Sequence, residues 1–108
     1  MKGKQYLRDT KEYSRVHQQG AVFRRRGLNL KAAENGMEYS RWGLVVSKKV
    51  GSSVVRNRVK RMLREIFRQT HIKSGWDLVI VARPYINSMS YENIKNQVNA
   101  MLEEAGII

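Results

Sequence analysis

The residues with the clearest chemistry are cations gathered in one stretch of the chain, which we call the cationic segment. It contains Arg41, Lys48, Lys49, Arg56, Arg58, Lys60, Arg61, Arg64 and Arg68, with Glu65 as its only acid. Arginine binds phosphate through two parallel hydrogen bonds, and lysine acts as a point charge. Asn57 lies between two of the arginines and can both donate and accept hydrogen bonds. The segment therefore suits a phosphodiester backbone.

The position of these charges favours binding over simple solvation. Arg56 and Arg58 lie in or beside the first turn of a helix expected to begin near Ser53. Cations there oppose the positive end of the helix dipole and cost about 0.3–1 kcal/mol each when exposed. Free backbone N–H groups at a helix start also attract phosphate. An ordinary solvated face is the alternative, but a sequence shaped only by stability would carry Asp or Glu at these positions.

The whole chain is basic as well. Its 108 residues include 21 Lys and Arg against 9 Asp and Glu, which gives a net charge of +12, and a second cluster occupies Arg24, Arg25 and Arg26. Such a charge indicates a polyanionic partner, with nucleic acid first and an anionic membrane second. The apolar runs are too short to span a bilayer, and no apolar segment follows the basic N-terminus. We expect a cytoplasmic protein without a membrane partner.

The sequence contains no familiar catalytic arrangement. Cysteine is absent, which excludes disulfides, thiolate metal sites and cysteine nucleophiles. The acids show no paired spacing that would suit general acid-base or metal catalysis. We therefore predict no catalytic residue and no bound metal on the protein. A nuclease that uses the only two histidines, His17 and His71, is a weak alternative.

The expected elements alternate in a pattern typical of an α+β domain. Helices are predicted over about 10–19, 54–70 and from Ser90 onward, and strands over 21–25, 28–33, 42–48 and 76–82. The order α-β-β-β-α-β-α predicts a two-layer α/β sandwich with about four strands in a mixed sheet and three helices. Thr10 is the expected cap of the first helix, and Lys48 is expected at a strand end. No linker is visible, so residues 1–108 form one domain.

Two runs of residues resemble a known family. The run from Val46 to Gly51, Val-Ser-Lys-Lys-Val-Gly, is followed by Val55-Arg-Asn-Arg-Val-Lys-Arg-Met-Leu-Arg-Glu65. Together they are similar to the signature of the bacterial ribonuclease P protein subunit, whose hallmark is Arg-Asn-Arg, here Arg56-Asn57-Arg58. The run from Trp76 to Arg83 resembles the family's last strand. The likeness covers nearly the whole chain.

The resemblance implies a specific function. Family members are protein subunits of a ribonucleoprotein endonuclease that removes the 5′ leader of precursor tRNA and leaves a 5′-phosphate. The RNA subunit is the catalyst and uses Mg²⁺, while the protein binds that RNA and the leader. The family fold is an α/β sandwich with a left-handed strand-helix-strand crossover, an exception to the usual rule.

The resemblance also implies which residues bind RNA. The expected RNA-binding residues are Lys48, Lys49, Arg56, Asn57, Arg58, Lys60, Arg61, Arg64 and Arg68. The expected leader cleft lies between the first helix and the sheet and includes Tyr13, His17 and Lys31. Family members often carry aromatic residues where His17 and Lys31 stand, so stacking is expected mainly from Tyr13. A ribosomal protein, another RNA-binding module or a helix-turn-helix DNA binder are the alternatives, although we expect no DNA partner.

Overall fold

The computed structural model describes residues 4–108. Its elements follow the chain as β1 (Lys4–Tyr6), α1 (Thr10–Gln19), β2 (Ala21–Arg24), β3 (Leu28–Glu34), β4 (Ser40–Val45), the 3-10 turn η1 (Lys48–Val50), α2 (Ser53–Gln69), β5 (Trp76–Ala82), the 3-10 turn η2 (Pro84–Ser88) and α3 (Tyr91–Glu104). The α+β class, the mixed sheet and the three helices are confirmed. The sheet has one strand more than expected, β1. Its three residues are too few to show an alternating pattern in the sequence.

The strands form one mixed sheet in the order β1-β4-β5-β3-β2. β2 and β3 form an antiparallel hairpin, β3 pairs antiparallel with β5, and β5 runs parallel to β4. β4 and β5 are therefore adjacent strands joined by a crossover that contains α2. β1 extends the sheet at the outer edge of β4, pairing in parallel with Ser40–Trp42.

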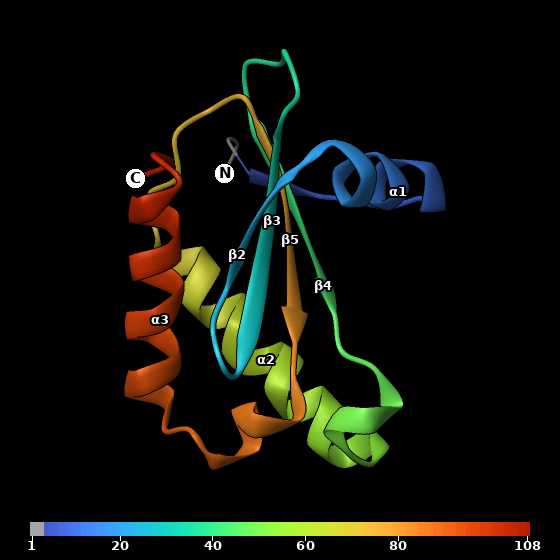
Figure 1. The fold of residues 1–108 in the computed structure, drawn as a ribbon, viewed down its shortest axis with the longest axis vertical. Coiled ribbons are helices and arrows are strands. Elements are labelled where there is room, and N and C mark those ends of the chain that lie inside the picture. The colour runs from blue at the N-terminus through green and yellow to red at the C-terminus, as the bar shows by residue number, and fades with distance from the viewer. Residues whose placement is uncertain (1–3) are drawn as a thin grey trace.

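Helices lie on both faces of this sheet. Figure 1 shows α2 and α3 on one side of the strands and α1 apart from them on the other side. The large core lies between the sheet and α2 and α3, where Leu30, Leu78 and Ile80 meet Leu63 and Phe67. Trp42 stacks on Phe67 with ring centroids 4.8 Å apart. Val16 of α1 and Val79 of β5 belong to a small separate cluster on the opposite face.

All three helices begin at a side-chain cap, including Ser90 at the start of α3. Asp9, rather than the expected Thr10, caps α1: its carboxylate accepts from the Glu12 amide at 3.0 Å, and the Glu12 carboxylate accepts from the amide of Asp9. This reciprocal arrangement satisfies two amides, which a threonine cap at the next position would not do. Ser52 caps α2, in agreement with the expected start near Ser53.

The strand expected to reach Lys48 ends at Val45. Alternation from Trp42 and Val46 would have placed Lys48 on the buried face, where an unpaired ammonium is costly. The chain instead turns into η1, which leaves Lys48 and Lys49 exposed and buries Val50. The side-chain amide of Asn87 in η2 donates to the Val50 carbonyl at 2.6 Å and attaches this turn to the rest of the fold.

Candidate nucleic-acid interface

The cationic residues of α2 lie on the side of the helix that faces away from the core. Val59, Leu63, Ile66 and Phe67 are buried against the sheet and α3. The other side of the helix is exposed or half-buried and presents six cations and one asparagine. They are Arg56, Asn57, Arg58, Lys60, Arg61, Arg64 and Arg68. With Lys48 and Lys49 in η1, they form what we call the α2 surface. The structure therefore places the predicted RNA-binding residues on one side of one helix and the turn before it.

Few of these charges are neutralised within the protein. Of the cations on the α2 surface, Arg68 alone pairs with a carboxylate among residues 4–108, that of Glu65 three residues earlier. Like-charged neighbours without acidic partners repel each other, so the surface is favourable only with a counter-anion. That property is expected of a surface that binds phosphates.

Two hollows flank the exposed side of α2. One is lined by Arg58, Arg61, Met62, Arg64, Glu65, Arg68 and Tyr91 of α3. The other is lined by Tyr6, Leu7, Tyr13, Trp42, Gly43, Leu44, Lys60 and Arg64. Arg64 lines both. Each hollow combines guanidinium or ammonium groups with an aromatic ring, which is the combination that holds single-stranded nucleic acid.

Arg56 differs from its neighbours. Its Nε donates to the Gly51 carbonyl at 3.1 Å, and one of its terminal nitrogens donates to the Ser53 hydroxyl at 3.3 Å. Gly51 itself has φ 155°, and a Cβ at this position would press on Val55. Arg56 therefore holds the loop before α2 as well as contributing charge, whereas Arg58 has no partner among the described residues and is free to bind an anion.

Arg41 does not belong to the α2 surface, although the sequence groups it with the cationic segment. It lies on the α1 face, where it donates to Asp77 at 2.9 and 2.7 Å and to Glu12 at 2.7 Å. Asp77, whose side chain is fully buried, also accepts from Arg15 at 2.5 Å and from Asn35 at 2.9 Å. We call these five residues the Asp77 network. It attaches α1 to the sheet beside the expected leader cleft.

The network sets the charge states of its members. Burial alone would raise the pKa of Asp77, but hydrogen bonds from Arg41, Asn35 and Arg15 outweigh it and hold that pKa below its ordinary value. The hydrogen bond to Asp77 in turn raises the pKa of Arg41. Asp77, near the start of β5, is therefore an anion that holds α1 against the sheet.

The expected cleft residues lie on the α1 face in two places. Lys31 of β3 donates to the Nδ1 atom of His17 at 2.8 Å. Partial burial and the nearby Lys31 charge lower the pKa of His17, which favours the neutral imidazole that can accept this bond. Tyr13 instead lies over Gly43 of β4, where any side chain would collide with the phenol ring. Burial raises the pKa of Tyr13 and keeps the phenol protonated.

The two histidines lie far apart in the fold. His17 is on α1, while His71 lines a hollow with Gln69, Lys95 and Asn99 on the side of α2 and α3. Among residues 4–108, no group of three His, Cys, Asp or Glu is placed to hold a metal ion. None of the helices in that range is both long and apolar enough to cross a membrane.

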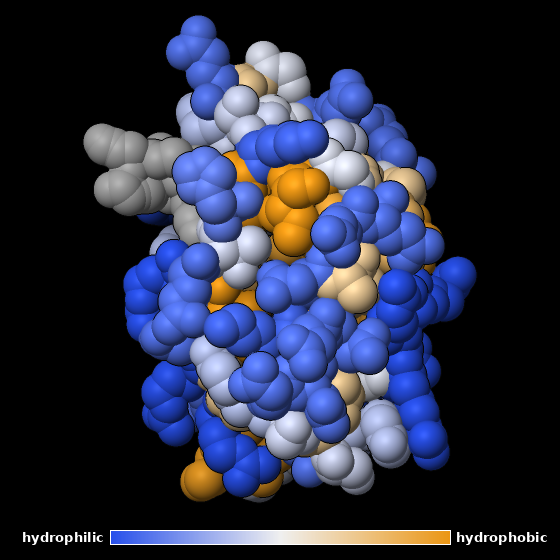
Figure 2. Space-filling view, turned by 90° about the vertical axis from the view of Figure 1, so that its left-hand side faces the viewer, coloured by the Kyte–Doolittle hydropathy of each residue, from blue (hydrophilic) through white to orange (hydrophobic). Residues whose placement is uncertain are grey.

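Figure 2 shows the face of the molecule that carries α3. Hydrophilic side chains cover most of this face, and the most hydrophilic ones gather along both of its margins. Small apolar areas lie between them. The face that carries α3 is therefore predominantly polar.

Known proteins with similar sequences and structures share one description. The chain matches the Ribonuclease P family over residues 1–106. It is 41% identical over 108 residues to a ribonuclease P protein component of Dehalococcoides mccartyi, covering 100% of this chain and 90% of that protein. It is 39% identical over 104 residues to one from Clostridium botulinum strain Langeland, covering 94% of each.

Solved structures agree with these relatives. An RNase P protein mutant from Staphylococcus aureus, described as defective in mRNA degradation activity, superimposes with a TM-score of 0.88 at 27% identity, covering 98% of this chain and 90% of that one. The RNase P protein from Thermotoga maritima superimposes with a TM-score of 0.83 at 27% identity, covering 93% and 96%. This chain therefore belongs to the ribonuclease P protein family, the protein subunits of the endoribonuclease that matures the 5′ end of tRNA.

Proposed function

We propose that the α2 surface binds the RNA subunit of ribonuclease P and that the α1 face of the sheet binds the 5′ leader of precursor tRNA. The RNA subunit carries out the cleavage with Mg²⁺, and the protein supplies affinity for both RNAs, in the cytoplasm. The observation that carries this proposal is the row of arginines and lysines on α2 that lack acidic partners in residues 4–108.

The arrangement supports a binding role rather than a chemical one. The described residues offer phosphate-binding cations and stacking rings, but the two histidines are separated and no carboxylate cluster for metal is present among them. Cations that neutralise phosphates on both RNAs reduce the need for free Mg²⁺, because protein charge takes over part of the screening.

Reconstitution tests the proposal directly. Precursor tRNA is incubated at low Mg²⁺ with the RNA subunit alone, with the protein alone, and with both, and the released leader is quantified. We expect efficient cleavage only with both. Cleavage by the protein alone, or no stimulation of the RNA subunit, would refute the proposal. An mRNA substrate in the protein-alone arm tests the activity for which the Staphylococcus aureus mutant is described as defective.

Replacing Tyr13 with alanine tests whether the protein contacts the leader through this ring. We expect the preference for precursor over mature tRNA to fall by about tenfold, because a base stacked on an aromatic ring contributes roughly 1–3 kcal/mol. Binding of the RNA subunit is expected to stay unchanged. Affinities for the two tRNAs and for the RNA subunit, measured by filter binding, check this result.

Tyr13→Phe is the matched control, because it keeps the ring and removes only the hydroxyl. It is expected to retain the preference for precursor tRNA. Equal loss of affinity for precursor and mature tRNA in Tyr13→Ala would show that the ring does not touch the leader.

A further inference from the structure

A fourth hollow shares no lining residue with either RNA surface proposed above. Its walls come from the β2–β3 turn (Arg25, Arg26, Gly27), from η2 and the residue after it (Tyr85, Ser88, Met89) and from α3 (Asn93, Gln97). We call it the turn pocket. Its volume is about 340 Å³, within the range of small-molecule sites. It contains two members of the Arg24–Arg26 cluster, which neither the α2 surface nor the leader cleft uses.

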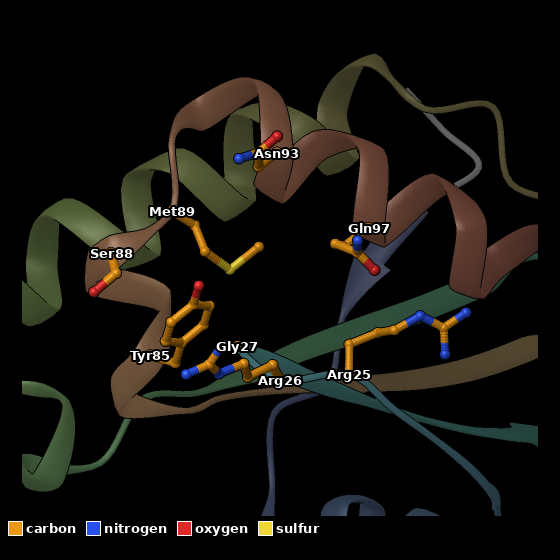
Figure 3. Close-up of a pocket in the computed structure, with 8 residues that line it drawn as sticks. All are labelled: Arg25, Arg26, Gly27, Tyr85, Ser88, Met89, Asn93 and Gln97. Atoms are coloured by element: carbon orange, nitrogen blue, oxygen red, sulfur yellow. The ribbon is translucent and has the colours of Figure 1, made fainter.

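One wall of the turn pocket is formed by Arg26 and Tyr85, which make a cation–π contact. The Arg26 guanidinium lies 3.9 Å from the centroid of the Tyr85 ring. Figure 3 shows the two side chains together, with Met89 above them beside α3. Arg26 has no carboxylate partner among the described residues, and Tyr85 is 37% exposed. A guanidinium plane held in this way is a stacking surface for a nucleobase.

The floor of the pocket depends on a glycine. Gly27 is buried, and a Cβ at this position would collide with the Met89 sulfur. The absence of a side chain therefore lets Met89 lie against the turn. Methionine is a polarizable apolar surface that accommodates flat rings of different shape.

A polar group in the wall lacks a partner. The Oε1 atom of Gln97 is buried and accepts no hydrogen bond from residues 4–108. Buried acceptors are nearly always satisfied, so such an atom needs an explanation. Figure 3 shows this oxygen on the side of Gln97 away from Met89, so the side-chain amide must turn into the pocket before it can accept from a ligand N–H donor, such as the exocyclic amine or ring N–H of a nucleobase. The side-chain amide of Asn93, one helical turn earlier on α3, can form a hydrogen bond with a neighbouring polar atom on the same edge of the base.

We propose that the turn pocket binds one nucleotide of an RNA, with its base between Arg26, Met89 and Gln97 and its phosphate near the arginines of the turn. Arg25 is held at the rim by its ion pair with Glu104 at 2.9 Å, and Figure 3 shows its side chain running along α3 away from Tyr85. Arg26 is therefore the main free cation of the site. This proposal rests on the proposed function, because the RNA is one that the protein already binds.

The fold places this pocket next to the α2 surface. Tyr91 lines the hollow that contains Arg58 and Arg61, while Asn93, two residues later, lines the turn pocket. The first turn of α3 therefore separates the two hollows, and an RNA bound along α2 can cross this turn and insert one unpaired nucleotide. This continuity favours a nucleotide within RNA over a free one, although both share the same chemistry.

Gln97→Leu distinguishes a ligand site from a structural residue by two readouts. Leucine has a similar size and removes the unpartnered oxygen, so the unfolding midpoint of the free protein should stay equal or rise. The affinity for the RNA subunit or for precursor tRNA should fall about fivefold. A merely structural glutamine would show the opposite pattern, with a lower midpoint and unchanged affinity, and that result would overturn the proposal.

Arg26→Gln tests the stacking cation, with Lys73→Gln as its matched control. Both variants remove one exposed positive charge, but Lys73 lies outside every RNA surface proposed here. We expect Arg26→Gln to weaken RNA binding about tenfold and Lys73→Gln less than twofold. Equal effects would mean that only net charge matters. Ultraviolet crosslinking of Tyr85 to a single RNA nucleotide, lost in Arg26→Gln, would identify the bound residue.

Binding of free adenosine and cytidine monophosphates tests whether the pocket takes a free nucleotide or a nucleotide within RNA. Stabilisation of the protein by either one, with RNA affinity unchanged in both variants, would assign the pocket to free nucleotides and overturn the RNA proposal. If the wild-type protein binds RNA through α2 and the pocket variants bind equally well, the pocket inference alone fails. If the wild type does not stimulate the RNA subunit, the proposed function fails.

Discussion

Replacing Arg58, Arg61 and Arg64 together with glutamine is expected to lower the affinity for the RNA subunit by about 100-fold or more. Each guanidinium that contacts a phosphate contributes roughly 1 kcal/mol or more, and the three line one hollow on α2. The slope of log affinity against log salt should flatten by up to about three units, about one for each lost phosphate contact. Filter binding over a salt series measures both quantities.

A matched control removes three exposed cations elsewhere. Arg8, Lys11 and Lys73 are exposed and lie outside the α2 surface. Their combined replacement by glutamine changes the net charge equally and should reduce affinity by a few-fold at most. If the two triple variants lose affinity equally, the RNA responds to total charge, and α2 has no special role.

Arg56 should behave differently from Arg58 in the same assay. Arg58→Ala should weaken binding without changing the unfolding midpoint, because its side chain is exposed and has no partner among the described residues. Arg56→Ala should also lower the midpoint, since it breaks the bonds to Gly51 and Ser53 that order the loop before α2.

Asp77→Ala is expected to lower the free energy of unfolding by about 3–5 kcal/mol. Its carboxylate is completely buried and pairs with Arg15 and Arg41, so the substitution leaves two guanidinium groups without their shared anion. Urea denaturation followed by circular dichroism measures the loss. Since the same carboxylate attaches α1 to the sheet, affinity for precursor tRNA should fall with it.

The pH dependence of stability provides an independent check on Asp77. Its pKa in the folded protein is below the ordinary value of 3.8, so its contribution is complete above that value and is lost as the pH falls through the folded pKa. The wild type should therefore lose stability below about pH 4, and Asp77→Ala should show a shallower decline there. An identical acid profile in both proteins would contradict the network.

The sequence predicted the elements that carry local periodicity. The apolar positions of α2, its cap and the cations on its other side all follow from residues within one helix, and the structure places them as expected. The sequence also predicts strands over 21–25, 28–33 and 76–82, each end within one residue of the structure. Gly27 marks the turn between the first two strands, and Pro84 follows the end of the third.

Apart from the cap of α1, where Asp9 takes the place of the expected Thr10, the errors concern contacts between distant parts of the chain. Arg15, Asn35, Arg41 and Asp77 meet only after the sheet has formed, and no spacing in the sequence indicates this. Sequence position alone therefore groups Arg41 with the wrong surface. The alternating pattern predicts that the strand reaches Lys48, whereas the burial of Val50 and the hydrogen bond from Asn87 accompany a turn of the chain at Lys48–Val50.

Arg64 lines both hollows beside α2, one shared with Tyr91 and the other with Tyr13. A single guanidinium cannot neutralise a phosphate of each RNA as completely as two separate cations would. When leader and RNA subunit occupy the protein together, fewer counterions should be displaced than the sum of the two separate associations. If both RNAs bind as proposed, their two binding equilibria are expected to be coupled through the Arg64 side chain.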